Sequence, residues 1–498
     1  MPIEQKDLIS PLPATDTNKT KWGQFGTLVS VFFFWGFVAA SNDVLIPVFK
    51  EKLKLEQWQA QMVSFAFYVA YSVGALLYFM ISKILKQDLL NKIGYKNGIS
   101  IGLIVSAIGT LLFIPAASTE SFGLFISGLF TIGLGFSLQQ TAANPMAINM
   151  GSASTGSQRL SMAGGVNNFG TTIGPLIVNL AIFGSVTSLV VTSLSTVKTP
   201  YLILGAAFLL VAVIFYFSSV PNKLVSNTEE LAEAKNTWVD RGTPFKYPQL
   251  VLGMIAIFVY VGVEVSTAAN LPEFMKQKLG TATSATAPYI SLFWASLMIG
   301  RWTASAGAFG FSEGTKKVLQ FLMPYLAFGV FLLVNAIAKH DLQPFYVYAA
   351  VIVALIIANF LSMGNPARQL LIFSICGIIA LLIAIFSPDY NVSVYAICSV
   401  GLFCSTLWPC IFTLAISGLG KHTSEGSNFL IFMICGGGII SLLQGYLSGD
   451  HLLGISFSYF VGIACFVYLA YYAIKAKNDL KDQGIDLDEL SKVKGGGH

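Results

Sequence analysis

The chain has 498 residues, of which 55% are hydrophobic and only 11% are charged, and its mean hydropathy is +0.70. Soluble globular domains carry about a quarter charged residues, so this composition excludes that class and predicts an all-α polytopic membrane protein. The net charge of +5 is no sign of a nucleic-acid partner, because in a membrane protein the placement of Lys and Arg matters more than their sum.

The chain begins with a polar tail, residues 1–24, and no signal peptide is visible before the first apolar run. Fourteen apolar segments follow, each long enough to cross about 30 Å of hydrocarbon. Six precede a polar linker, residues 221–247, and eight follow it. The fourteen segments are 25–48, 59–84, 98–116, 122–149, 160–184, 200–220, 248–271, 286–308, 317–338, 343–363, 369–387, 391–417, 427–448 and 453–474.

These segments divide the chain into an N-terminal bundle, residues 25–220, and a C-terminal bundle, residues 248–474, joined by the linker. A tail, residues 475–498, ends in GGGH, which resembles a tag remnant. With the N-terminus inside, only seven of the 29 Lys and Arg fall in outside loops, so the positive-inside rule puts both tails and the linker in the cytoplasm. The seven are Lys50, Lys52, Lys54, Lys198, Lys276, Lys278 and Lys339.

The most informative stretch is Gly133–Pro145, GLGFSLQQTAANP, which places several amides inside the fourth apolar segment. Polar groups at membrane depth are costly unless they meet partners or a water-filled cavity. Gln140 and Asn144 are four residues apart and share a helix face, and Pro145 is expected to kink or loosen the helix. This row of neutral donors and acceptors suits an uncharged, polyhydroxylated ligand. Hydrogen bonding between helices is the alternative.

Two carboxylates lie deep in apolar segments. Asp43 lies in the first segment, directly after Asn42, which is a candidate substrate-binding amide, and Glu264 lies in the seventh. A charged side chain costs about 2.5–3.5 kcal/mol at the bilayer centre on insertion scales, so an intramembrane acid is by default a functional hypothesis. Asp43 is the stronger candidate for a coupling residue, while Glu264 could equally tie its helix to a neighbour.

The six cysteines all fall in apolar runs of the second half, without a CxxC pair or a histidine-rich cluster. We therefore expect small buried side chains and neither a metal nor a cofactor. There is also no nucleophile elbow and no phosphate-binding loop, and an enzyme is not expected.

Several short motifs together resemble the fucose:proton symporter family of the major facilitator superfamily, and within it the bacterial glucose/galactose branch. The similarity extends over residues 25–220 and 248–474. The motifs are WGFVAASNDVLIPVF (35–49), LQQTAANP (138–145), NNFG (167–170), YVGVEV (260–265), MIGRW (298–302) and LLQGYLSGD (442–450).

The resemblance implies two six-helix bundles that transport sugar with a cation by alternating access. It places the family's proton-linked acid of the first helix at Asp43 and a sugar-contacting amide at Asn167. The fucose transporter's second acid corresponds to Gln140, which cannot titrate, so Asp43 would couple alone or with another group. The chain also departs in length, since fourteen segments exceed a core of twelve. An extra helix pair within 317–387 is the favoured explanation, and one long irregular region is the alternative.

Further candidates come from the sugar-site chemistry and from the loops. Sugars have an apolar face, so Trp294 and Trp408 are predicted to oppose the amides, together with Gln444 of the second half. Arg301 and Lys96 resemble gating residues of this superfamily, although positive-inside topology explains them equally well.

The combined prediction is a monomeric symporter that imports a monosaccharide, such as a hexose, across the bacterial inner membrane. Its partners would be the sugar, the coupling cation and the lipid bilayer. The coupling ion is expected to be a proton, with Na⁺ as the alternative, because Asp43 could serve either ion. An exporter of drugs or lipophiles on the same fold is less favoured, since such a cavity would contain few amides.

Overall fold

The computed structural model describes residues 20–52, 57–183, 198–223, 240–281, 286–449 and 451–492. Within these ranges, the side chains of 39–65, 175–176, 178–183 and 492 lie outside the description. In the described part, eleven helices are long and apolar enough to cross a membrane. The all-helical membrane architecture predicted from composition is therefore confirmed.

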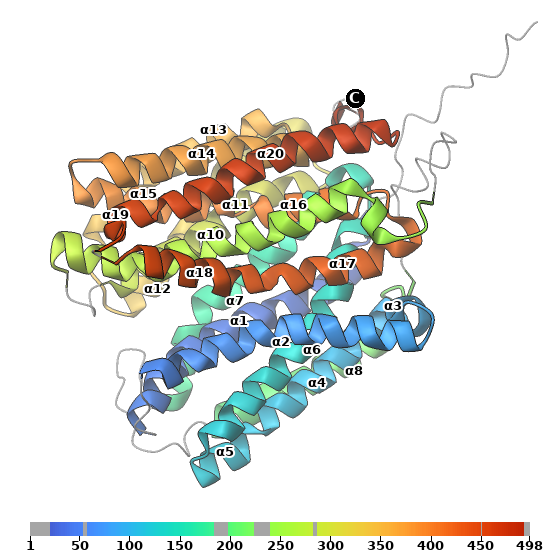
Figure 1. Ribbon diagram of the computed structural model, residues 1–498, viewed down its shortest axis with the longest axis horizontal. Helices are drawn as coiled ribbons and strands as arrows, with labels where there is room; N and C mark the ends of the chain where they lie inside the picture. Colours follow the sequence, from blue (N-terminus) through green and yellow to red (C-terminus); the bar gives the residue numbers. More distant parts are fainter. Residues whose placement is uncertain are drawn as a thin grey trace, which may run out of the picture.

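Each predicted segment of the first half forms a single helix except 98–116, which forms two (Figure 1). The helix α1 packs against α7, α2 packs against α6, and α4 packs against both α6 and α8. The predicted segment 98–116 corresponds to α4 continued by α5, because the chain tightens at Leu112. The elements are α1 (Trp22–Lys52), α2 (Gln57–Ile84), α3 (Leu89–Ile93), α4 (Tyr95–Leu111), α5 (Phe113–Thr119), α6 (Phe122–Asn149), η1 (Ala153–Thr155), α7 (Gly156–Phe183) and α8 (Lys198–Phe217).

The second half follows the segment 240–247 and ends in a short helix at the C-terminal side. Two of its predicted segments are broken helices, α15–α16 and α17–η8–α18. The elements are η3 (Pro244–Lys246), α10 (Pro248–Leu279), α11 (Ala287–Ser305), η5 (Ala306–Ala308), α12 (Glu313–Ile337), η6 (Gln343–Phe345), α13 (Tyr348–Ser362), α14 (Pro366–Phe386), α15 (Tyr390–Cys404), α16 (Leu407–Ile416), η7 (Gly420–His422), α17 (Thr423–Phe432), η8 (Met433–Cys435), α18 (Gly436–Leu447), α19 (Gly454–Ser458), α20 (Phe460–Asp482) and α21 (Leu487–Lys492).

The two halves repeat one packing pattern. The pair α1–α7 corresponds to α10–α18, and the pair α2–α6 corresponds to α11–α15; α4 with its two partners corresponds to α14 with α15 and α20. In the pairs α1–α7 and α10–α18, the two helices are in close contact at a glycine. A Cβ on Gly36 would lie 1.8 Å from the Asn167 carbonyl oxygen, and one on Gly436 would lie 2.1 Å from that of Phe258. Only glycine allows so close an approach of two backbones.

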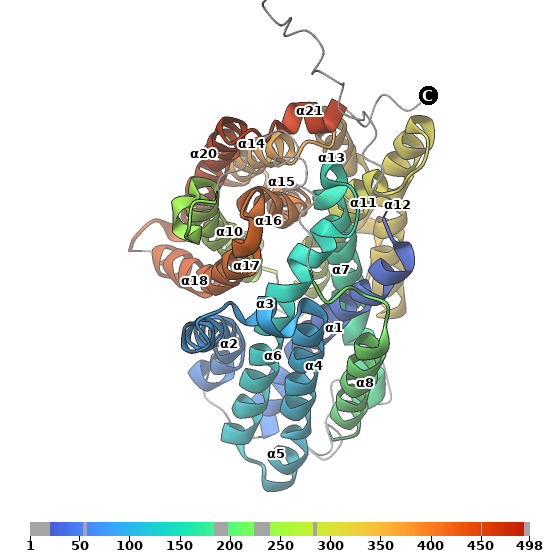
Figure 2. The same cartoon turned by 90° about the vertical axis from the view of Figure 1, so that its right-hand side faces the viewer.

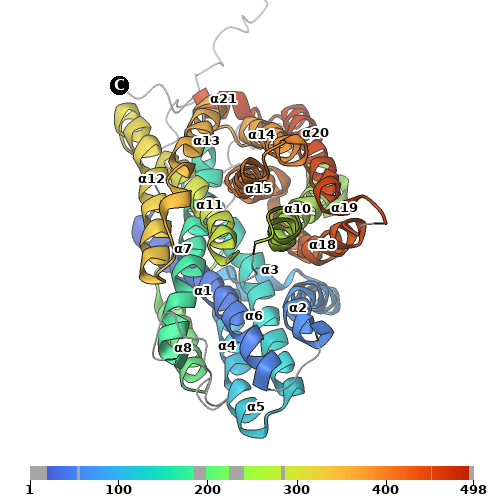
Figure 3. The ribbon, with the colours of Figure 1, turned by 90° about the vertical axis from the view of Figure 1, so that its left-hand side faces the viewer.

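Two helices of the second half have no counterpart in the first. The helix α12 packs against α11 and α13, and α13 packs against α14 (Figures 2 and 3). Both lie in the region 317–387, where the sequence predicts a surplus pair, and both carry many exposed apolar side chains, including Leu326, Leu333 and Ile357. They therefore add to the outer surface of the second half and leave its repeated core intact.

The two halves are in contact at one end and diverge at the other (Figure 1). We call the contacting end the linker-side end, because the segment 240–247 lies there. Polar side chains close it: Asn428 Nδ2 donates to the Ala75 carbonyl at 3.0 Å, and Ser72 Oγ donates to that of Phe432 at 3.0 Å. Asn91 Nδ2 donates to the carbonyl of Lys421 at 3.1 Å. Opening this end requires these bonds between the halves to break.

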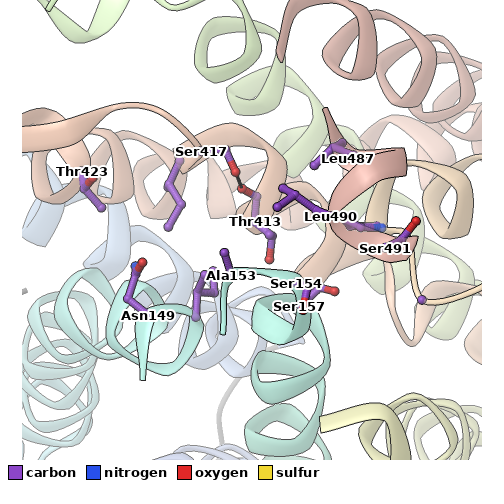
Figure 4. Close-up of a pocket in the computed structure, with 14 residues that line it drawn as sticks. Asn149, Ala153, Ser154, Ser157, Thr413, Ser417, Thr423, Leu487, Leu490 and Ser491 are labelled. Carbon is purple, nitrogen blue, oxygen red and sulfur yellow. Dashed lines mark hydrogen bonds between the residues drawn. The ribbon is translucent and has the colours of Figure 1, made fainter. Parts of the chain in front are cut away.

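The helix α21 covers part of the linker-side end. Figure 4 shows Leu487, Leu490 and Ser491 lining a small cavity of about 30 Å³ whose other wall includes Ser154 and Ser157 of the first half. The helix is tied to the second half through Asp488, which accepts from Lys477 at 2.6 Å and from Arg368 at 3.3 Å. The helix α21 is thus anchored in the second half and reaches across the boundary to the first half.

Asp240, just before α10, joins the linker to the start of α17. Its carboxylate pairs with Lys421 at 2.6 Å and with His422 at 3.2 Å. The hydrogen bond from Lys421, with further help from the Gly242 N–H, lowers the pKa of Asp240 from 3.8 to about 2. A lowered pKa in the folded state gives stabilisation that is present above the ordinary pKa and is lost as the pH falls through the lower value.

We expect Asp240→Asn to lower the melting temperature slightly, by the same amount from pH 8 to pH 5, because the carboxylate stays ionised throughout. The difference from the parent protein should shrink only below about pH 4. Thermal unfolding in detergent tests this, in a His422→Gln background that removes the imidazole from the pair with Asp240. A difference that already disappears near pH 6 would contradict it.

Candidate functional site

A central cavity of about 310 Å³ lies between the two halves. That volume is at the lower end of the range for small-molecule sites. Its walls combine neutral polar groups with aromatic rings, and it contains one carboxylate and one guanidinium among its described residues. The polar lining consists of Tyr68, Tyr71, Gln140, Asn144, Asn167, Asn168, Thr171, Tyr260, Glu264 and Arg301; the aromatic lining includes Phe32, Trp35, Phe67, Trp294 and Trp408.

Most of the residues singled out from the sequence lie together in this cavity. The seven that line it are Gln140, Asn144, Asn167, Trp294, Trp408, Glu264 and Arg301. Two others lie elsewhere: Gln444 is fully buried in α18 away from the cavity lining, and Lys96 Nζ donates to the Ser218 carbonyl at 3.2 Å within the first half. The side chains of Asn42 and Asp43 lie outside the described residues.

The two adjacent glutamines of α6 have different surroundings. Gln139 is fully buried, accepts from Trp35 Nε1 at 2.9 Å and donates to Ser106 Oγ at 3.0 Å. Gln140 lines the cavity, and its Nε2 donates to the Tyr71 hydroxyl at 3.0 Å. Gln139 therefore joins helices, as the alternative interpretation of the amides proposed, while Gln140 remains available to a ligand.

Pro145 leaves α6 unbroken, since the helix continues to Asn149. Its effect is on hydrogen bonding instead. Because proline has no N–H, the Thr141 carbonyl lacks its usual partner one turn later. That carbonyl accepts from Ser427 Oγ of the second half at 2.8 Å. The proline thus frees a backbone acceptor for contact between the halves.

Two asparagines complete the polar wall of the first half. Asn167 Nδ2 on α7 donates to the Phe32 carbonyl of α1 at 3.1 Å. Asn144 Nδ2, one turn after Gln140, is buried without a hydrogen-bond partner among the described residues. A buried unpaired donor costs about 1–3 kcal/mol, and its position in the cavity wall marks it as a place where a ligand oxygen could bind.

The second half contributes the charged groups. Tyr260 donates its hydroxyl proton to Glu264 Oε2, one turn later on α10. Arg301 on α11 donates from Nε to the Ser405 carbonyl at 2.9 Å and from Nη2 to the Tyr260 hydroxyl at 3.5 Å. On the other side, its Nη1 donates to Asn168 Oδ1 at 2.7 Å. Arg301 therefore lies within the cavity wall and not in a peripheral loop.

Sequence reasoning did not single out several cavity residues, among them Tyr71, Tyr260 and Asn168. Tyr260 could have been found, because it lies four residues before Glu264 on the same helix face. Asn168 was overshadowed by its neighbour Asn167, since adjacent positions of α7 both reach the cavity. Tyr71 carried no local signal, because its importance depends on Gln140 of another helix.

Comparisons with known proteins agree with this architecture. The model of the Major Facilitator Superfamily matches residues 25–364. The chain is 32% identical over 469 residues to a glucose/galactose transporter of Brucella abortus, covering 93% of this chain and 97% of that one. It is 28% identical to the L-fucose-proton symporter of Escherichia coli K12, covering 90% of this chain and 92% of that one.

Solved structures agree on the fold. A crystal structure of the E. coli fucose:proton symporter superimposes with a TM-score of 0.65 at 23% identity, covering 91% of this chain and 98% of that chain. A Major Facilitator Superfamily transporter solved in the outward conformation gives a TM-score of 0.67 at 24% identity, with the same coverage.

Proposed function

The chain belongs to the Major Facilitator Superfamily, and from that premise we propose that it is a cation-coupled symporter that imports a monosaccharide by alternating access. The observation that carries the proposal is the central cavity, whose walls present uncharged amides from the first half and tryptophans from the second. Amides can donate to and accept from sugar hydroxyls, while the flat rings suit the apolar face of a pyranose.

The alternatives fit less well. The chain is not an enzyme, because its family and its relatives are transporters. An exporter of lipophiles would need a mainly apolar cavity, whereas Gln140, Asn144 and Asn167 all reach this one. The named relatives transport glucose, galactose or L-fucose, which supports a hexose or deoxyhexose here.

For coupling, we propose a proton taken up at Asp43, with Na⁺ as the alternative ion. Gln140 lines the cavity where the fucose transporter's second acid is expected and cannot titrate. Glu264 is the described carboxylate of the cavity and is the candidate for a second coupling group. No cofactor enters the proposed cycle.

The proposed topology has fourteen spans, with the pair α12–α13 added to a twelve-helix core. The start of α1, the segment 240–247 and α21 lie at the same end of the molecule, since Gln24 Nε2 donates to the Ser219 carbonyl and α21 contacts η1. The positive-inside rule makes this the cytoplasmic end. The structure would then be closed toward the cytoplasm and open outward, as a monomer in the bacterial inner membrane.

The test is uptake of a labelled monosaccharide panel into proteoliposomes under an inward proton gradient and, separately, an inward sodium gradient. We expect proton-driven accumulation of one hexose. In Asp43→Asn we expect accumulation to be lost while sugar exchange across the membrane remains, because exchange needs binding and isomerisation but no net ion release. Full accumulation in Asp43→Asn would refute the coupling role, and sodium-driven accumulation insensitive to pH would establish the other ion.

A further inference from the structure

Arg301 is the charged side chain that joins the two halves at the cavity. On the second-half side it is held by the carbonyl of Ser405 at 2.9 Å. On the first-half side, Nη1 reaches both Asn168 Oδ1 at 2.7 Å and the Gly164 carbonyl at 3.2 Å. These acceptors on α7 are neutral and carry only partial negative charges. Among the described residues, no carboxylate of the first half contacts the guanidinium when the halves are closed.

The neighbouring residue makes a parallel contact. Trp302 Nε1 donates to the carbonyl of Gly165 at 3.2 Å. A Cβ on Gly164 would lie 3.0 Å from Arg301 Nη1, and one on Gly165 would lie 2.8 Å from Trp302 Cδ1. The two glycines therefore leave room for both side chains against the α7 backbone. We call these contacts of Arg301 and Trp302 with α7 the α7–α11 contact.

The compensating charge for Arg301 lies behind it, in the second half. Glu264 interacts electrostatically with Arg301, and the Tyr260 hydroxyl connects them by donating to Glu264 and accepting from Arg301. Other titratable groups around this unit are Cys404 of α15 and, across the cavity, Tyr68 and Tyr71. On α18, Gly437 packs against Val261 and Val265, and Ile440 packs against Gly262.

We propose that Glu264 is a coupling residue that sets the stability of the α7–α11 contact through Tyr260 and Arg301. Ionised Glu264 keeps the linker-side end closed, and a proton delivered to it from the cavity releases that end. This proposal rests on the proposed symport and assigns it a second proton-dependent step, located in the second half.

The direction follows from the charge on Arg301. With Glu264 ionised, its carboxylate compensates the charge of the half-buried guanidinium electrostatically and through the Tyr260 hydroxyl. Once Glu264 is neutral, the closed state keeps the Arg301 guanidinium away from water without a compensating charge. Removing one charge of a buried pair in this way is strongly destabilising. Opening rehydrates Arg301 and removes that cost, so the protonated protein favours the open linker-side end. A proton-loaded carrier that opens inward is what import requires.

The experiment measures the gate without any sugar or gradient. Spin labels at Gln87→Cys and Asp482→Cys, both exposed at the linker-side end, report the separation of the halves by pulsed EPR. The half-buried Cys376 and Cys435 are changed to alanine in this background. In the otherwise unaltered protein, the long-distance population should rise as the pH is lowered. In Glu264→Gln it should be high at every pH, with the open-to-closed ratio about five- to tenfold above that of the parent at high pH.

Three variants make the result specific. Tyr260→Phe removes the connecting hydroxyl and should also raise the open population. Adding Arg301→Gln to Glu264→Gln should cancel the shift, because no unpaired cation remains. Glu273→Gln, at an exposed acid of the same helix, should behave like the parent.

The proposal is overturned if Glu264→Gln retains the pH-dependent distances of the parent protein, or if its shift persists without Arg301. Because the readout is a distance, failure here would leave sugar symport intact. Equally, a negative result in the transport assay would leave the pH dependence of the measured distances unaffected.

Discussion

Replacing Asn144 by leucine should weaken sugar binding about 10- to 100-fold without destabilising the protein. The Nδ2 donor of Asn144 is buried and unpaired among the described residues, and it belongs to the wall of the central cavity. Leucine has a similar volume, so the change removes an unsatisfied polar group and opens no void. A bound sugar would instead face an apolar side chain with one of its hydroxyls unpaired, which costs about 1–3 kcal/mol.

The matched control is Gln139→Leu, five residues earlier on the same helix. Gln139 bonds to both Trp35 and Ser106 and lies away from the cavity, so its loss should lower the melting temperature and leave the dissociation constant nearly unchanged in the folded fraction. Equilibrium binding of labelled sugar and thermal unfolding in detergent separate the two effects. If Asn144→Leu melts lower than the parent and binds sugar normally, Asn144 is a structural residue.

Replacing Gly36 by alanine should damage both the fold and the site. The new Cβ would lie 1.8 Å from the Asn167 carbonyl oxygen and 2.8 Å from Thr171 Oγ1. Because the obstacle is helix backbone, α1 and α7 must move apart, and overpacking of this kind costs about 1–3 kcal/mol. The bond from Asn167 to the Phe32 carbonyl crosses the same contact, so the cavity amide should be displaced as well.

We therefore expect a lower melting temperature together with weaker sugar binding. Gly26→Ala provides the comparison, because it lies on the same helix and a Cβ there has no neighbour within 4 Å; it should resemble the parent in both measurements. Normal stability and binding in Gly36→Ala would mean that α1 and α7 tolerate a wider separation than this packing indicates.

The helices were predictable from the sequence because each apolar segment is a local pattern whose length is set by the bilayer. The count of segments predicts an extra helix pair within 317–387, and two further membrane spans there stay a prediction. The breaks at Ser405–Thr406 and at Met433–Cys435 were not predicted, because each falls inside an apolar segment, 391–417 or 427–448, and helix breaks there depend on tertiary packing.

The site residues that were easiest to predict are polar side chains inside an apolar segment, where their burial in the membrane is unfavourable. Gln140, Asn144 and Glu264 are costly in an apolar segment, and all three line the cavity. Gln444 and Gln139 carry the same local signal and lie elsewhere, because the face that a side chain presents depends on which helix packs behind it. Tyr71 and Tyr260 were missed, since a tyrosine in an apolar run is inexpensive and does not stand out.

The covering of the linker-side end by α21 has a consequence for biosynthesis. The small cavity there joins residues near Ser154 to residues near Leu490, so the part of its wall that α21 supplies is synthesised after the rest of the lining. At translation rates of about 5–20 residues per second, the first half waits roughly 20–70 s for that partner. Its waiting surface combines the polar Asn149, Ser154 and Ser157 with Ile148 and Ala153, so most of its side chains can remain hydrated during this interval. This part of the seam between the halves can therefore be completed only after α21 has been synthesised.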